Sequence, residues 1–514
     1  MMSDTHYLSR RTIYGENEKL LTETAVTEQA LRQAADENCD AIIISGDLTD
    51  LGDRYSNEDF VELLKEIKKK KKVYTIFATH DFHHHRAYVA KPGNSEKITS
   101  KPWEMPYFDV SRADGPLPEL IEAVTPEELW EMYYEFGPSE AYSVFAPDFS
   151  YCIDLDDHTR CLMLNDIFRN EEALQDISAS FTPGCFKWIK QMKDEADRDG
   201  KFIFAVSHHP FMPAVPAHRM KASVRNLRSP YTGHLLADIG IPLAFTGHTH
   251  CIDVGFMRSD KGNLLCDIAS PSVRFYPPMY RLVNLDGIHG KIAYDCVEVQ
   301  KPEGVEIEEN TLTEYYANDM RRDYLAPITG RDDFIGSLLR KLTVGNLAFF
   351  ARSGGLTKDE LALIKDRNFA DFIMDIALNM MRGDGDFFPD TPEYKFTRGI
   401  AAFADSIVDS LPFVDINKKY LEGYTVWQIL EPMLYPESVS NMRDVFDFTE
   451  EPARKYDTSP AKSYAGPILM AIMFILAVIL SPLLCPAGII TLAVGLIKKK
   501  INARKKPKQP LMRY

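Results

Sequence analysis

The first 300 residues alternate short apolar runs with longer stretches in which apolar residues recur at helical spacing. The apolar runs are "AIIIS" (41–45), "VYTIFA" (73–78), "RCLMLN" (160–165), "FIFAVS" (202–207) and "IPLAFTG" (241–247). Near-continuous runs of this length are typical of strands that are buried on both faces. The helical stretches between them are Glu16–Asn38, Asn57–Lys72 and Pro183–Arg198. This alternation predicts an α/β layered domain over residues 1–300.

Two other parts of the chain depart from this alternation. Residues 83–150 are rich in proline and aromatic residues, and we expect them to form an insertion, such as a lid over a site. From about residue 312 to 460, runs such as "ADFIMDIALNMMR" place apolar residues at helical spacing and contain no catalytic cluster. This second pattern predicts a smaller all-α domain over residues 312–460.

An uncharged segment follows. Residues 465–497 are 33 consecutive residues without a charged side chain, and about 20 apolar residues are enough to cross a bilayer. The segment therefore predicts attachment to a membrane, with the cell membrane as the expected location. Pro482 and Pro486 interrupt it and leave two alternatives, a single membrane helix or a helical hairpin. The basic tail 498–514 is expected in the cytoplasm, whereas the side on which residues 1–300 lie stays open.

Charge and cysteine content narrow the function. The net charge is −16, and eight Lys or Arg without any acid in residues 498–514 leave −24 on residues 1–497. Residues 1–497 are so acidic that they repel the phosphate backbone of nucleic acids, which argues against general nucleic-acid binding. The eight cysteines are scattered without a CxxC pair, a pattern that favours reduced thiols over a zinc ribbon or a disulfide framework.

Five short stretches carry side chains that bind metals, and four of them directly follow an apolar run. They are "SDTH" with Asp4 and His6, "SGDLTD" with Asp47, "ATHD" with Thr79, His80 and Asp81, "SHHP" with His208 and His209, and "TGHTH" with His248 and His250. Ligands at the carboxyl ends of strands converge on one edge of an open α/β sheet. Carboxylates and imidazoles without thiolate suit Mn, Fe, Zn or Ni. The number of such ligands predicts a site for two divalent metal ions that share a bridging carboxylate.

In order and spacing, these stretches resemble the calcineurin-like metallophosphoesterases. That family has the pattern D-x-H, G-D, G-N-H-D/E, H and G-H-x-H, and the resemblance covers about residues 1–300. It implies a layered αββα sandwich with two mixed sheets. The implied activity is hydrolysis of a phosphomonoester or phosphodiester in a phosphorylated small molecule or a lipid. The resemblance says nothing about residues 312–514.

The resemblance also implies a role for each candidate residue. The first metal ion is held by Asp4, His6 and His250, the second by His208 and His248, and Asp47 bridges the two. His80 acts on the scissile phosphate as general acid or electrostatic clamp, with Asp81 fixing its orientation. His209 is expected to support a ligand, and residues 83–85, all histidine, to lie in a solvated or lid loop.

The chain departs from the family pattern at two places. Thr79 stands where the second metal ion usually has an asparagine, and a hydroxyl is a poorer donor than an amide oxygen. This substitution keeps an alternative open, a membrane-tethered binding or scaffold protein with an impaired phosphoesterase fold. The second departure is that only Met1–Ser3 precede Asp4, where a strand of about four to six residues is usual. We therefore expect a start further upstream, which leaves room for a signal peptide, or a shortened first strand.

Overall fold

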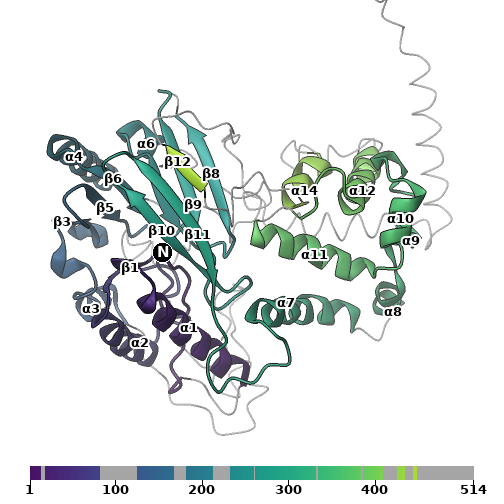
Figure 1. The fold of residues 1–514 in the computed structure, drawn as a ribbon, viewed down its shortest axis with the longest axis horizontal. Coiled ribbons are helices and arrows are strands. Elements are labelled where there is room, and N and C mark those ends of the chain that lie inside the picture. The colour runs from purple at the N-terminus through teal and green to yellow at the C-terminus, as the bar shows by residue number, and fades with distance from the viewer. Residues whose placement is uncertain are drawn as a thin grey trace, which may run out of the picture.

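A seven-stranded mixed sheet is the largest layer of the fold (Figure 1). The computed structural model describes residues 1–12, 18–81, 124–166, 181–211, 232–259, 261–330, 334–383, 386–408, 425–434 and 444–447. The strand order is β3 (Ser143–Phe145), β4 (Ser150–Asp154), β5 (Thr159–Met163), β6 (Phe202–Val206), β7 (Leu243–Thr246), β9 (Leu264–Ala269) and β8 (Asp253–Arg258). Strands β5, β6, β7 and β9 are parallel neighbours, and the antiparallel pairs lie at both edges. The strands that precede His208 and His248 are therefore adjacent in the middle of the sheet.

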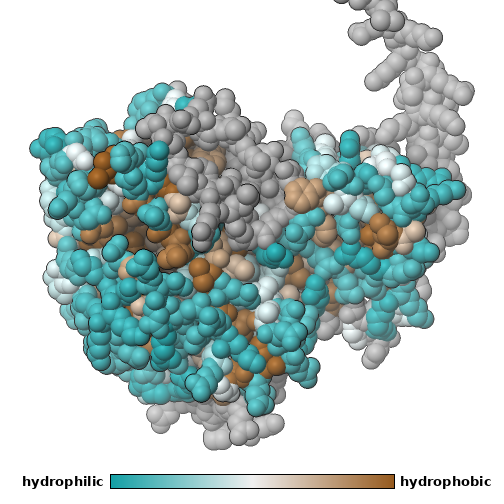
Figure 2. Space-filling model, in the orientation of Figure 1, coloured by the Kyte–Doolittle hydropathy of each residue, from teal (hydrophilic) through white to brown (hydrophobic). Residues whose placement is uncertain are grey.

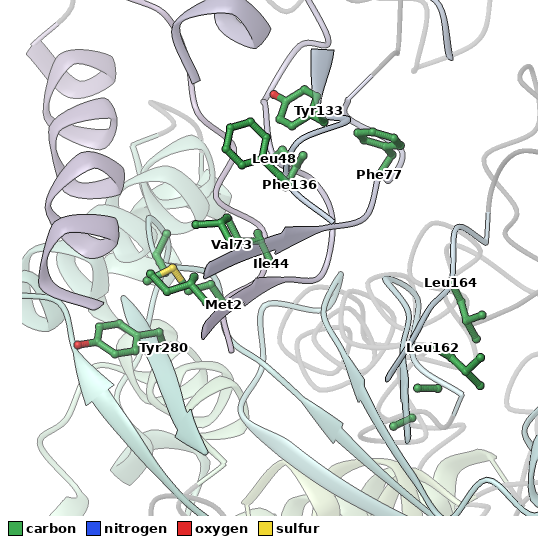
Figure 3. Close-up of a cluster of buried hydrophobic side chains, with 14 of the residues drawn as sticks. Met2, Ile44, Leu48, Val73, Phe77, Tyr133, Phe136, Leu162, Leu164 and Tyr280 are labelled. Atoms are coloured by element: carbon green, nitrogen blue, oxygen red, sulfur yellow. The ribbon is translucent and has the colours of Figure 1, made fainter. Parts of the chain in front are cut away.

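Two smaller sheets are joined through the first residues of the chain. β1 (Ala41–Ile44) pairs in parallel with β2 (Lys72–Thr75), and β10 (Met279–Asp286) pairs antiparallel with β11 (Lys291–Glu298). The backbone N–H of Met2 donates to the Ile43 carbonyl at 2.9 Å, and that of Arg281 donates to the Met1 carbonyl at 2.9 Å. Figure 3 shows the Met2 side chain beside Ile44 and Val73. Residues 1–3 thus form backbone hydrogen bonds on both sides, although they are too few for an ordinary strand.

Alternate residues of these strands enter different cores, as the two-residue period of a strand requires. Ile43, Tyr74 and Tyr294 are buried with Phe204 and Phe245 of the seven-stranded sheet, so the sheets pack face to face. Ile42, Ile44 and Val73 point the other way and join apolar residues of α1 (Glu18–Asp36) and α2 (Arg54–Lys68).

Helices also cover the outer face of the seven-stranded sheet. Ile189 of α4 (Pro183–Asp199) and Leu236 of α6 (Thr232–Ile239) are buried with Leu162 and Ile203. Helix α4 begins where Thr182 accepts a hydrogen bond from the Cys185 amide, and it ends at Gly200 in the left-handed conformation. The predicted α/β layering of residues 1–300 is therefore confirmed.

The later part of the chain is mainly helical, as predicted. Its helices are α7 (Leu312–Thr329), α8 (Phe334–Lys341), α9 (Val344–Leu347), α10 (Lys358–Ile364), α11 (Phe369–Arg382), α12 (Pro392–Val408) and α14 (Val426–Leu434). We call residues 312–434 the helical region; it lies beside the sheets in Figure 1 and has its own core around Phe372 and Phe396. However, β12 (Asp444–Asp447) pairs with β11, so the stretch to residue 460 is not wholly helical.

Residues 83–150 were expected to form an insertion, and the described part of this range, from residue 124 onward, packs into the domain. Residues 126–132 form α3 (Pro126–Met132), and Leu129, Tyr133 and Phe136 are fully buried in the main core. Figure 3 shows Tyr133 and Phe136 there. The Tyr133 hydroxyl donates to Asn57 Oδ1 of α2 at 3.0 Å. An aromatic-rich stretch therefore supplies core, because its large side chains are buried against α2. The rest of the expected lid, including histidines 83–85, lies outside the described residues.

The membrane expectation concerns a part of the chain that the structure does not describe. Among the described residues, no helix combines the length and the apolar character that crossing a bilayer requires. The segment 465–497 and the basic tail 498–514 lie outside those residues. Hydrophilic residues cover most of the coloured surface in Figure 2, with smaller apolar areas between them.

Candidate metal centre

The expected ligands lie on turns with an unusual backbone. Asp4, His6, Asp47, His248 and His250 all have positive φ, between 41° and 65°. Residues other than glycine seldom adopt this left-handed conformation, which costs on the order of 1 kcal/mol each and clusters at functional sites. The turns follow directly on β1, β7 and the bridge-forming residues 2–3, so the strand ends bring all five residues to one edge of the sheets.

Two glycines allow these turns to approach one another. A Cβ atom on Gly247 would lie 2.6 Å from Asp4 Oδ2, well inside van der Waals contact. A Cβ on Gly46 would lie 2.7 Å from the Cβ of Ala78 and 3.0 Å from His208 Nδ1. Both contacts join segments that are distant in the sequence, so glycine at these positions is a requirement of the site.

The first group of ligands is Asp4, His6 and His250. Each offers one ligand atom within 4.8 Å of the others. Asp4 Oδ1 lies 3.2 Å from His250 Nε2, and the Nε2 atoms of His6 and His250 lie 3.3 Å apart. Asp4 Oδ1 is buried and has no hydrogen-bond partner. A buried carboxylate oxygen without a hydrogen-bond partner is unfavourable unless a cation lies beside it, so the group fits a metal ion.

The second group is Asp47, His208 and His248, again with ligand atoms within 4.8 Å. His208 Nε2 lies 3.1 Å from Asp47 Oδ2 and is fully buried, but it makes no hydrogen bond. The same Asp47 oxygen lies 3.8 Å from His6 Nε2 of the first group. Asp47 therefore reaches both groups, as a bridging carboxylate must, and so does Asp4, whose Oδ1 lies 3.8 Å from His208 Nε2. The structure brings all six expected ligands together.

Thr79 lies beside the second group. Its hydroxyl is 3.4 Å from Asp47 Oδ1, which also accepts a hydrogen bond from the His80 amide at 2.9 Å. The hydroxyl thus faces the bridging carboxylate at the place where the family pattern has an amide. It offers the second ion a shorter side chain and a weaker donor.

His80 lies at the open side of the centre, with 22% of its side chain exposed. Its ring meets that of His6 edge-on at a centroid distance of 4.5 Å, and its Nδ1 lies 2.7 Å from the Asp50 carbonyl oxygen. The role expected for Asp81, fixing the orientation of this ring, stays a prediction. The Asp81 carboxylate accepts hydrogen bonds from the Thr49 and Ala78 amides, so it joins two backbone loops, and Asp50 contacts the imidazole.

Asp50 and Arg274 belong to the site although the sequence did not single them out. Asp50 Oδ1 lies 3.3 Å from His6 Nδ1, and Arg274 donates to the His6 carbonyl and, at 2.6 Å, to Glu23. His6, Asp50 and His80 are also close enough to hold a cation, but the Arg274 guanidinium, 3.9 Å from Asp50, opposes one there. Asp50 is the last residue of "SGDLTD", so its place beside Asp47 in the sequence could have marked it as a site residue. Nothing in the sequence around Arg274 marks it in this way.

The sequence model of one protein family, calcineurin-like phosphoesterase, matches residues 1–251. Residues 1–251 belong to this family. The phosphoesterase is accordingly a hydrolase that acts on phosphoester bonds. No curated protein sequence matches the chain.

Two solved structures of phosphatases resemble the phosphoesterase weakly. A dimetal phosphatase from Danio rerio matches at 12% identity with a TM-score of 0.37, over 58% of this chain and 97% of the other. A purple acid phosphatase from yellow lupin matches at 12% identity with a TM-score of 0.31, over 60% of this chain. The match spans about half of the lupin chain, 52%. TM-scores this low give no information about the substrate.

Metal binding to the phosphoesterase should release protons. Burial alone would lower the pKa of His6, but hydrogen bonds with Asp4 and Asp50 raise it to about 9. Burial is likewise outweighed at His208, where Asp47 and Asp4 raise the pKa to about 10. We therefore expect both imidazoles to be protonated at neutral pH in the metal-free protein, so that each ion displaces one proton.

We expect Mn²⁺ affinity to rise with pH up to about 9, by roughly tenfold per pH unit for each displaced proton. Calorimetric titration at neutral pH in two buffers of different ionisation enthalpy measures the release, which should be about one proton per ion. Titration heats that do not depend on the buffer would show that the metal-free histidines are already neutral.

Thr79→Asn should strengthen the second metal site. The amide oxygen would supply a better ligand, so we expect about tenfold tighter binding of the second ion, equal to ~1.4 kcal/mol. The first ion, which Thr79 does not approach, is the internal control and should keep its affinity. Two equally tight ions in the wild type, with no gain in the variant, would show that another group already fills the position.

Proposed function

We propose that the protein is a metal-dependent phosphoesterase that hydrolyses a phosphomonoester or phosphodiester, with a phosphorylated small molecule or a lipid as substrate. The observation that carries the proposal is the pair of ligand groups with Asp47 between them and His80 at their open side. The donor set of carboxylates and imidazoles suits two divalent ions such as Mn, Fe, Zn or Ni. The family match over residues 1–251 supports the same reaction class.

When bound, two such ions supply a water molecule activated for attack and neutralise charge on the phosphate oxygens. Asp4, His6 and His250 would hold one ion and Asp47, His208 and His248 the other. His80 donates a proton to the leaving oxygen, or stabilises its charge, because its ring faces the open side while Nδ1 is tied to the Asp50 carbonyl. Asp81 keeps the loop of His80 against the loop of Asp47 through the Thr49 and Ala78 amides.

The test is hydrolysis of an aryl phosphate and of an aryl phosphodiester by the full chain, with added Mn²⁺. We expect activity that disappears with a chelator and returns when Mn²⁺ is restored. Activity that persists in excess chelator would overturn the proposal. Tight binding of a phosphate analogue without turnover under any divalent metal would favour the alternative, a membrane-tethered binding or scaffold protein, which the threonine at position 79 motivates.

We further propose the finer architecture that the family implies. The seven-stranded sheet and the smaller sheets joined through residues 1–3 would be the two inner layers of an αββα sandwich, with residues 312–460 as an additional domain. The face-to-face packing of Ile43, Tyr74 and Tyr294 on Phe204 and Phe245 supports the two-layer arrangement. The separate core around Phe372 and Phe396 supports the additional domain.

We also propose that residues 465–497 attach the protein to a membrane, with the tail 498–514 on the cytoplasmic side. The support is the absence of charge over 33 residues and the eight basic residues that follow, each worth roughly 1 kcal/mol near anionic lipid. Deleting residues 461–514 should move the protein from the membrane to the soluble fraction and leave hydrolysis intact. A truncated protein that stays with membranes after a high-salt wash would place the anchor elsewhere.

A further inference from the structure

The four ligand histidines are held in two different ways. His6 and His208 have a polar oxygen beside Nδ1: the Asp50 carboxylate lies 3.3 Å from His6, and the Ser45 carbonyl is hydrogen-bonded to His208 at 2.8 Å. Within the described part of the chain, the rings of His248 and His250 have no such partner outside the ligand set. Each of them lies against another ring instead. A ligand histidine normally needs a group on its second nitrogen to fix the ring plane, so these contacts must take over that task.

The rings that contact His250 and His248 differ in chemistry, and they belong to different halves of the centre. Phe275 stacks on His250 with a centroid distance of 4.9 Å and an interplanar angle of 16°, and it also meets His6 edge-on at 5.5 Å. His209 lies on His248 at 4.0 Å and is itself fixed by Asp166, which lies 3.1 Å from its Nδ1. Phe275 therefore touches two ligands of the first ion, and His209 touches a ligand of the second.

Helix α11 of the helical region contacts a residue near each ring of the Phe275–His250 stack. The Ile252 amide, two residues after His250, donates to the Met381 carbonyl at 2.9 Å. Tyr276, next to Phe275, is buried and hydrogen-bonds the guanidinium of Arg382. The last turn of α11 thus contacts the two segments that bring the rings together.

The same interface is a continuous apolar core. Leu378 of α11 and Tyr316 of α7 are buried together with residues of the sheets and of α1, and Figure 1 shows both helices on the side of the helical region next to the sheets. On the other side of the stack, Arg274 is buried and anchored by Glu23 and the His6 carbonyl. Phe275 is therefore fixed from both directions, by Arg274 and by α11.

We propose that Phe275 is a positioning residue for His250 and that the last turn of α11 maintains their stack, so that the helical region sets the affinity of the first metal ion. The proposal rests on the metal-dependent function proposed above. A flat aromatic face keeps the His250 ring in the plane that directs Nε2 toward Asp4 and His6. Without that face the His250 ring is free to rotate, and only the binding of the first ion is weakened.

The test is calorimetric titration of the full chain with Mn²⁺. We expect Phe275→Ala to lower the affinity for the first Mn²⁺ ion about tenfold and to leave the affinity for the second ion unchanged. Phe275→Tyr, which keeps the flat ring, should restore the affinity, and Phe275→Leu, which keeps the apolar volume, should not. Arg382→Met should weaken the first ion by a smaller factor, about threefold. Arg352→Met is the matched control in the helical region, because Arg352 lies over the exposed Phe349 and should change neither ion.

His209→Leu should have the opposite effect. It should lower the affinity for the second Mn²⁺ ion and leave the affinity for the first ion unchanged. Unchanged metal affinity in Phe275→Ala and Phe275→Leu would overturn the positioning role while leaving the proposed function intact. Equal weakening of both ions, together with a lower unfolding temperature of the metal-free protein, would overturn it too, because it would mean general loosening. A wild type that binds no Mn²⁺ would overturn this proposal and the proposed function together.

Discussion

Asp47→Asn should reduce Mn²⁺-dependent hydrolysis by about a thousandfold or more, equal to ~4 kcal/mol of transition-state stabilisation. Asp47 reaches both ligand groups, because its Oδ2 lies 3.1 Å from His208 Nε2 and 3.8 Å from His6 Nε2. An amide in its place keeps the shape but removes the negative charge that two cations share. The measurement is the initial rate with an aryl phosphate at saturating Mn²⁺.

The matched control is Asp157→Asn, which changes an exposed aspartate far from the ligand groups and should keep full activity. Circular dichroism of both variants separates loss of chemistry from loss of fold. An Asp47→Asn protein that is folded and retains more than a few per cent of the activity would contradict the bridging role.

His80→Ala should lower kcat by about a hundredfold without changing Mn²⁺ affinity, because His80 lies at the open side of the centre and is not a member of either ligand group. The loss should depend on the leaving group. A nitrophenolate leaves without protonation, whereas an alkoxide needs the proton that His80 supplies. We therefore expect a larger defect with an alkyl phosphate than with a nitrophenyl phosphate.

His158→Ala, at an exposed turn, is the control for His80→Ala and should behave as the wild type. Equal defects on both substrates would leave His80 as an electrostatic clamp and exclude it as the general acid. A weaker Mn²⁺ titration in His80→Ala would instead make it a ligand, through the group that it forms with His6 and Asp50.

The ligand set could be predicted from the sequence because its signals are local. Asp47 and His248 follow directly on buried strands, and such positions meet at one sheet edge whatever the remaining topology. The apolar runs likewise predicted the β1, β2, β5, β6 and β7 strands to within a few residues.

Contacts between distant segments were not predictable in this way. Arg274 reaches His6 and Glu23 only because the loop before β10 folds against α1, and no pattern in its own neighbourhood indicates that contact. The aromatic residues at 129–136 looked like a lid by composition, yet α2 supplies the surface that buries them. Asp81 carries the family's motif position, but its two backbone partners could be found only in three dimensions.

An anomalous difference map of crystals grown with Mn²⁺ tests most directly whether the protein binds two metal ions at this centre. If two ions bind, we expect two peaks about 3.5–4 Å apart. One should lie among Asp4, His6 and His250, and the other among Asp47, His208 and His248. A single peak at saturating Mn²⁺, or a peak among His6, Asp50 and His80, would contradict two-ion binding at this centre.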